Sequence, residues 1–214
     1  MTTPSPADLS GLTIQAFLNA LADKTPTPGG GSVAAIVGGL AGAQLRMTIA
    51  YTLGRKKFAA VEPLMQSTAE AVDQITAEFL QLMQQDAAAY QSLAGYLKMP
   101  PEQRTQEADF SRAARQAIDV PLKCARAARQ LIDHAAAIAD KINPHLISDL
   151  GVAVSLAGGV LACCELNVRV NLPILPDKNA AAACAQEMHQ LRRHAQETAD
   201  LVDRQVRVIM PAAD

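Results

Sequence analysis

Tryptophan is absent from this chain of 214 residues, and aromatic residues make up only 3% of it. A surface that stacks the bases of single-stranded nucleic acid needs several aromatic rings, so the composition argues against that class. The chain also lacks a basic surplus, because 19 Lys and Arg stand against 21 Asp and Glu. Since nucleic-acid binders usually carry such a surplus, the sequence predicts no nucleic-acid partner.

Signatures of metal binding and nucleophilic catalysis are also missing. The four histidines show no metal-ligand spacing, and neither an HExxH nor a GxSxG motif occurs. The four cysteines form no CxxC pair, and no signal peptide precedes them in the polar N-terminal segment. We therefore expect no bound metal, reduced thiols and a cytoplasmic protein.

Small and unbranched residues dominate the chain, of which 50% is hydrophobic. Alanine, which is abundant, loses no side-chain entropy in a helix, whereas the β-branched and aromatic residues that favour strands are few. The composition predicts an all-α fold, and the length suits a single-domain bundle of about six to eight helices. We expect residues 1–10 to form a flexible tail and residues 11–210 to form the helical domain.

Apolar periodicity and helix-breaking residues divide this domain into segments. We expect helices at about 14–21, 32–53, 63–97, 102–140, 148–172 and 178–209. Pro121 should kink or split the fourth segment, because proline has no N–H to donate along the helix. Ser148 or Asp149 should cap the fifth segment. Glycine and alanine concentrate in 32–53 and 150–165, which predicts that these two helices pack closely at the centre.

The uncharged stretch Pro26–Leu45 raises the alternative of a membrane-associated helix. Glycines and prolines occupy one end of it and Arg46 closes the other, so a spanning helix is the weaker interpretation. We expect a buried central helix and no membrane partner.

A glycine loop, Pro28-Gly29-Gly30-Gly31-Ser32, stands directly before one of the predicted helices. Consecutive glycines allow backbone N–H groups to approach a ligand, and the helix dipole favours an anion there. A flexible connector between two helices explains the same residues without any function.

Asp86 falls in the apolar stripe of the third segment, four residues after Leu82 and four before Tyr90. A carboxylate that faces a packed interior is costly unless it is paired or lines a cavity, and its pKa is often raised. Such a group can act as a general acid or base. The alternative is that Asp86 lies at the solvated edge of a wide stripe.

Two further groups of polar residues could bind a substrate. Arg55, Lys56 and Lys57 follow the second segment, where cations stabilise a helix C-terminus and could also hold an anionic tail. The second group consists of amides and a carboxylate near the fifth segment, which could contact a heterocycle or serve only as caps and helix bridges. These are Asn143, Asp149, Asn167 and Asn171.

Five motifs in order are familiar from one family: PTPGGGS from Pro26, TLGRKKF from Thr52, DAAAY from Asp86, NPHLISD from Asn143 and LNVRVNL from Leu166. With this spacing the chain resembles the cyclodeaminase/cyclohydrolase family over about residues 12–205. That family includes the C-terminal domain of formiminotransferase-cyclodeaminase and stand-alone methenyltetrahydrofolate cyclohydrolases.

The resemblance implies an all-helical subunit, a homodimer and a folate site near the subunit contact. It implies that Asp86 is the catalytic acid/base, and that Arg55, Lys56 or Lys57 hold the carboxylates of the folate tail. The glycine loop, Tyr90 and the four residues Asn143, Asp149, Asn167 and Asn171 become candidates for substrate binding. No bound cofactor is required, because a tetrahydrofolate derivative is itself the substrate.

The reaction stays open between two enzymes. A formimidoyltetrahydrofolate cyclodeaminase, which forms 5,10-methenyltetrahydrofolate and ammonia, is the first hypothesis by a small margin. A methenyltetrahydrofolate cyclohydrolase, which gives 10-formyltetrahydrofolate, is the alternative. A non-catalytic helical protein that binds folate or serves as a scaffold is the second alternative.

Overall fold

The computed structural model describes residues 8–210, and they form an all-α bundle as predicted. Among these residues there are seven α-helices, four short 3-10 helices and no strand. The α-helices are α1 (Ile14–Ala22), α2 (Gly30–Ala50), α3 (Glu62–Leu97), α4 (Pro101–Arg104), α5 (Phe110–Ile138), α6 (Ile147–Asn171) and α7 (Lys178–Ile209).

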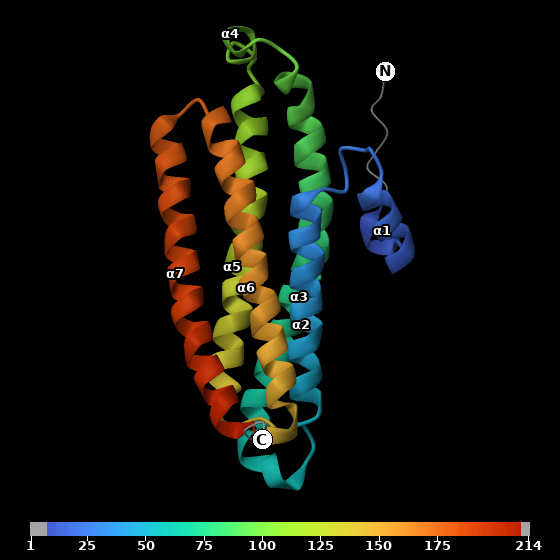
Figure 1. The fold of residues 1–214 in the computed structure, drawn as a ribbon, viewed down its shortest axis with the longest axis vertical. Coiled ribbons are helices and arrows are strands. Elements are labelled where there is room, and N and C mark those ends of the chain that lie inside the picture. Colours follow the sequence, from blue (N-terminus) through green and yellow to red (C-terminus); the bar gives the residue numbers. More distant parts are fainter. Residues whose placement is uncertain (1–7, 211–214) are drawn as a thin grey trace.

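Five long helices, α2, α3, α5, α6 and α7, lie side by side along the long axis (Figure 1). Helix α2 packs between α3 and α6, and α5 packs against both of these helices from the inside. Helix α7 covers α5 and α6 on the outer side. A single apolar core therefore runs the length of the bundle.

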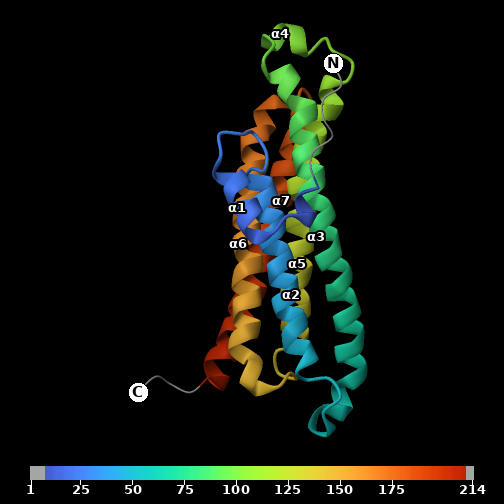
Figure 2. The same ribbon diagram turned by 90° about the vertical axis from the view of Figure 1, so that its right-hand side faces the viewer.

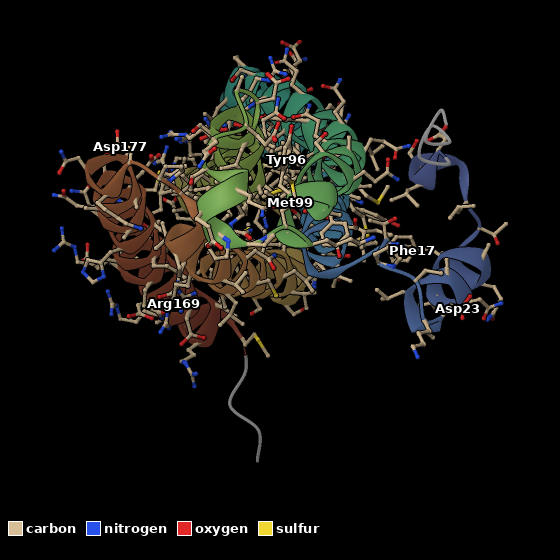
Figure 3. The ribbon with its side chains drawn as sticks, turned by 90° about the horizontal axis from the view of Figure 1, so that it is seen from above. Phe17, Asp23, Tyr96, Met99, Arg169 and Asp177 are labelled. Carbon is tan, nitrogen blue, oxygen red and sulfur yellow. The ribbon has the colours of Figure 1, made fainter. Side chains whose placement is uncertain are left out.

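Helix α1 stands beside the bundle rather than within it (Figure 1). Its amphipathic pattern turns Phe17 inward, with 4% of its surface exposed, whereas Ile14 is 78% exposed. Seen from above, Phe17 lies on the side of α1 that faces the bundle (Figure 3). The chain then returns to α2 through residues 23–29, which include the glycine loop.

Close helix packing is confirmed for α2 but not for the glycines of α6. A Cβ atom on Gly38 would lie 2.2 Å from Phe79 Cε1, and one on Gly42 would lie 2.2 Å from Thr76 Oγ1. Glycine is thus needed at both positions for α3 to approach. Around Gly158 and Gly159 of α6, no atom lies within 4 Å of a built Cβ. Gly158 and Gly159 thus lie on a side of α6 that is open, although α6 itself packs closely against α2 and α5 as predicted.

Of the two effects predicted for Pro121, a kink or a split of the helix, the split does not occur. The helix is continuous from Phe110 to Ile138 with Pro121 inside it. Proline leaves the carbonyl of Ala117, four residues earlier, without its helical donor. That carbonyl instead accepts a hydrogen bond of 3.1 Å from Asn171 Nδ2 on α6. The break appears between residues 105 and 109, where α4 ends before α5 begins.

Two predicted boundaries also differ from the structure. Asp8 caps a 3-10 helix over Leu9–Gly11 and Leu9 is buried, so the expected tail does not include these residues. Residues 1–7 of that tail lie outside the described part of the chain. Helix α6 begins at Ile147 after a short 3-10 turn, and Asp149 lies in its first turn instead of at the cap.

Two segments are long and apolar enough to cross a membrane, Gly30–Ala50 and Pro144–Ile174. Length and composition alone give this result, and the core helix of a soluble protein passes the same test. Both segments pack against neighbouring helices of the bundle, which is the arrangement expected of core helices.

Candidate functional site

A pocket of about 360 Å³ opens where α2 begins, between α3, α5 and α6. Figure 2 shows this position: α2 starts part of the way up the bundle, just after the loop from α1. Seven residues singled out from the sequence line the pocket. They are Gly29, Gly30, Gly31, Asp86, Tyr90, Asn167 and Asn171.

Asp86 lies against the first turn of α2 and is half-buried. Its Oδ2 atom accepts a hydrogen bond of 3.0 Å from the hydroxyl of Ser32. A Cβ atom on Gly31 would lie 1.8 Å from Asp86 Oδ1, so only glycine allows this approach. Ser32 is fully buried, and Pro28 is buried behind the glycine loop.

The pKa of Asp86 is raised above its ordinary value, because burial removes water from the charged form. Hydrogen bonds from the side chain and backbone of Ser32 act in the opposite direction but do not cancel this effect. The carboxyl group is thereby made a better proton acceptor than a solvated aspartate. This is the interior placement that the apolar stripe suggested.

Asn167 reaches the same helix end from α6. A Cβ atom on Gly30 would lie 3.1 Å from Asn167 Oδ1, so the amide packs directly on the glycine loop. The Nδ2 atom of Asn167 is buried and has no hydrogen-bond partner in the protein. An unpaired buried donor costs free energy, which makes it a candidate to bind a ligand group.

Asn171 has a different role, because its side chain is already satisfied. Its Nδ2 atom donates to the carbonyl of Asn167, at 3.0 Å, and to the carbonyl of Ala117, at 3.1 Å. The second acceptor is the one that Pro121 leaves free. Asn171 therefore joins α6 to α5 at the wall of the pocket, and Ala117 and Pro121 line that wall.

The rest of the pocket is an apolar slot that the sequence reasoning missed. Its side chains come from α3, α6 and the turn after α6, namely Leu93, Leu97, Val170 and Ile174. Tyr90 stands at the edge with 41% of its surface exposed. Leu93 and Leu97 follow Asp86 by seven and eleven residues, so the helical period could have placed them beside it.

Five predicted residues lie at the other end of the bundle. Arg55, Lys56 and Lys57 are exposed and follow the C-terminus of α2. Because α2 has 21 residues, they lie about 30 Å from the pocket along its axis. Asn143 and Asp149 lie near the start of α6, at this same end. Within one subunit the structure does not bring these five residues to Asp86.

Local contacts already use the polar groups of Asn143 and Asp149. The backbone N–H of Asn143 donates to Thr52 Oγ1 at 3.0 Å, and its Oδ1 atom caps the next turn by accepting from the His145 N–H. Asp149 Oδ1 accepts a hydrogen bond of 2.8 Å from Gln44 Nε2. These bonds hold the junction between α2 and α6.

Within residues 8–210 no group of three or more His, Cys, Asp or Glu side chains could hold a metal ion. The pocket offers one carboxylate, two amides and the N-terminal N–H groups of a helix. Such a set can move a proton and stabilise a polar intermediate.

Comparisons with known proteins agree with this arrangement. The family described as formiminotransferase-cyclodeaminase matches residues 13–190. Methenyltetrahydrofolate cyclohydrolase of Methylorubrum extorquens is 35% identical over 187 residues, which cover 86% of this chain and 90% of that protein. Formimidoyltransferase-cyclodeaminase of Rattus norvegicus is 31% identical, but the match covers 88% of this chain and only 36% of the rat protein.

A solved structure shares the whole fold. The crystal structure of formiminotetrahydrofolate cyclodeaminase from Thermotoga maritima superposes with a TM-score of 0.87 at 25% sequence identity. The match covers 94% of this chain and 98% of that one.

The fold and the pocket thus define an all-helical protein with a single proton-accepting carboxylate at a helix N-terminus. More specifically, the chain belongs to the formiminotransferase-cyclodeaminase family. The resemblance seen in the five sequence motifs is confirmed.

Proposed function

We propose that this protein is a folate one-carbon enzyme that hydrolyses 5,10-methenyltetrahydrofolate to 10-formyltetrahydrofolate. The observation that carries the proposal is Asp86, a half-buried carboxylate with a raised pKa in a pocket that also offers amide and backbone donors and an apolar slot. The choice of hydrolysis is supported by the cyclohydrolase of Methylorubrum extorquens, which this chain matches along 90% of that protein's length.

In this reaction Asp86 would accept a proton from water as the water oxygen bonds to the cationic methenyl carbon. The ionised carboxylate also stabilises the positive charge of the substrate before attack. Asp86 passes this proton to N5 and takes up the proton of the new hydroxyl group as the bond from the carbon to N5 breaks, which leaves the oxygen as the formyl group on N10.

A second candidate is the cyclodeaminase reaction, in which N10 attacks a formimidoyl carbon and ammonia leaves. The fold shared with the Thermotoga maritima cyclodeaminase favours it. Both reactions pass through the same carbon and need a proton acceptor there, so Asp86 serves either one. No bound cofactor is needed, because tetrahydrofolate carries the reacting group.

The pocket itself supports the placement of such a substrate. The slot of Leu93, Leu97, Val170 and Ile174 suits an aromatic ring system. None of the residues that line the pocket as a whole is basic. The carboxylates of a folate tail would therefore need cations from elsewhere. Arg55, Lys56 and Lys57 supply three cations, but at the far end of the subunit.

A homodimer would bring these two ends together. The face formed by α2 and α6 exposes large apolar side chains, which include Leu40 at 56%, Leu166 at 64% and Val170 at 68%. If two copies pack antiparallel across this face, the basic end of one α2 reaches the pocket end of the other. We expect a dimer in light-scattering measurements and a substrate site that both subunits form.

Mixing two impaired variants, assayed at substrate concentrations well below the wild-type KM, tests the shared site. Asp86→Asn subunits keep the basic segment, and subunits with Arg55, Lys56 and Lys57 all changed to alanine keep Asp86. After the two are unfolded and refolded together, mixed dimers with one intact site should regain activity. Activity no higher than the average of the two separate variants would mean that each site lies within one subunit.

The activity is tested with both substrates. Purified protein should consume 5,10-methenyltetrahydrofolate, followed by its absorbance, faster than the spontaneous reaction. Ammonia release from 5-formimidoyltetrahydrofolate measures the second candidate. Glu70→Gln, an exposed carboxylate on the same helix, is the matched control for Asp86→Asn.

If the wild type catalyses neither reaction but binds folate, it is a non-catalytic binding protein or scaffold, and the proposal fails.

Fractionation of the producing cells, before purification, tests the cellular location. We expect the protein in the soluble cytoplasmic fraction, and recovery with membranes would instead support a membrane partner for α2 or α6.

A further inference from the structure

We infer that Asn167 is a catalytic residue that favours hydrolysis over ammonia release, because its Nδ2–H group donates to the oxygen that water adds to the reacting carbon. The inference rests on the proposed function, since it assigns a role within the same pocket.

The starting observation is an unpaired donor at a defined place. Asn167 Nδ2 is buried and makes no hydrogen bond within the protein, although neighbouring Asn171 uses its own Nδ2 atom twice. Leaving a buried amide donor unpaired costs free energy. A ligand acceptor placed against Asn167 would remove that cost.

The position of Asn167 relative to Asp86 gives the donor its function. Gly31 meets the carboxylate of Asp86, and the adjacent Gly30 meets the amide of Asn167. The two side chains therefore flank the first turn of α2 and line one pocket. An atom that bonds to carbon beside Asp86 is within the region that Asn167 can also reach.

The helix end adds donors of the same kind. The first hydrogen bond along α2 runs from the Val33 N–H to the Gly29 carbonyl, at 2.9 Å. The N–H groups of Gly30 and Gly31 precede it and have no helical acceptor. Both glycines line the same pocket as Asn167 and Asp86, so these donors lie at the side of the pocket where the carboxylate is the acceptor.

Because the pocket has several donors beside one acceptor, it should affect the two reactions differently. In hydrolysis, water adds its oxygen to the methenyl carbon and gives a proton to Asp86, which forms a carbinolamine. Asp86 passes that proton to N5 and then takes the proton of the new hydroxyl group, so the oxygen carries negative charge until the bond from carbon to N5 breaks and the oxygen becomes the formyl carbonyl. Donors aimed at such an oxygen stabilise it, and loss of one typically lowers kcat by about 10²-fold or more.

In deamination the group at the same position is a nitrogen that must leave as ammonia. It carries protons of its own and gains positive charge as it departs. A donor from Asn167 cannot stabilise it, so removing that donor should have little effect on the rate of ammonia release.

The test compares Asn167→Ala and Asn167→Asp with the wild type on both substrates. For hydrolysis we expect kcat to fall by about 10²-fold in each variant while KM changes little, because the methenyl carbon carries no oxygen before attack. For deamination we expect a much smaller decrease. Asn179→Ala, an exposed asparagine on α7, is the matched control.

Four results would overturn the inference. They are an equal loss of kcat in both reactions, a loss confined to deamination, a rise in KM without a change in kcat, or no change at all in either variant. Asn167→Asp has nearly the shape of asparagine, so it keeps the test usable if the alanine variant fails to fold. If the wild type catalyses neither reaction, the proposed function fails first, whereas wild-type activity that resists both substitutions rejects only the role of Asn167.

Discussion

The two ends of α2 place the predicted site residues in opposite physical settings. At its N-terminus, Asp86 is half-buried against glycine and Ser32, and the pKa of its carboxyl group is raised. At its C-terminus, Arg55, Lys56 and Lys57 are exposed to water. The first end is suited to chemistry and the second to attraction of charge.

Each end also requires a glycine, but for a different reason. Gly31 is needed for space, because a Cβ atom would lie 1.8 Å from Asp86 Oδ1. Gly54 has open space around it but a φ of 71°, a left-handed conformation that most side chains disfavour. The same residue type therefore makes room for Asp86 at one end and forms the turn after a helix at the other.

The largest effect on turnover should come from removing the charge at the pocket end of α2. Asp86→Asn removes the proton acceptor and should lower kcat by about 10²-fold or more for whichever reaction the protein catalyses. Circular dichroism should show an unchanged helix content. An Asp86→Asn protein with full turnover would show that the buried end has no catalytic role.

Gly31→Ala tests the need for space at the pocket. The added methyl group should push Asp86 away from its position, and a displacement of about 1 Å can cost up to about 10²-fold in turnover. Gly158→Ala on α6 is the control, since no atom lies within 4 Å of its Cβ position. Equal turnover in the two variants would contradict the close approach of Asp86.

At the basic end the effect should fall on binding. Changing Arg55, Lys56 and Lys57 to alanine should raise KM by about tenfold, the loss expected for one charge-assisted contact, and leave kcat near that of the wild type. The increase should shrink at high salt, because exposed charges are screened. A fall in kcat with constant KM would instead place this segment in the chemistry.

Gly54→Ala should affect stability only. A left-handed conformation costs an alanine about 1–2 kcal/mol, which should appear in the free energy of unfolding measured with urea. Activity at temperatures well below unfolding should stay the same. A variant that is as stable as the wild type would mean that the turn adapts easily to another conformation.

The smallest effect concerns the dependence of stability on pH. Because burial raises the pKa of Asp86 in the folded protein, protonation favours folding below the ordinary value of 3.8. That contribution is lost as the pH rises through the folded pKa. Asp86→Asn should therefore be more stable than the wild type near neutral pH, and the gap should close as the pH falls below 3.8.

Helix pattern and motif order predicted much of the molecule. The apolar stripe placed Asp86 inside, and the glycine loop pointed to the helix end that meets it. Local sequence could not separate Gly38 from Gly158, because the difference between them is the presence of Phe79 on another helix. It also could not show that Asn143 and Asp149 lie far from Asp86 within one subunit, since that depends on the direction of α6 in the bundle.

The effect of Pro121 also depends on a residue that is distant in the sequence, Asn171. A proline inside a helix is normally a defect, but here the carbonyl that it frees becomes a fixed attachment point for Asn171 of α6. The Ala117 carbonyl, which lacks a donor within α5, thus helps to fix the position of α6 along α5. A substitution that restored an N–H at residue 121 would make Asn171 share this acceptor with α5, which would weaken the link between the two helices at the wall of the pocket.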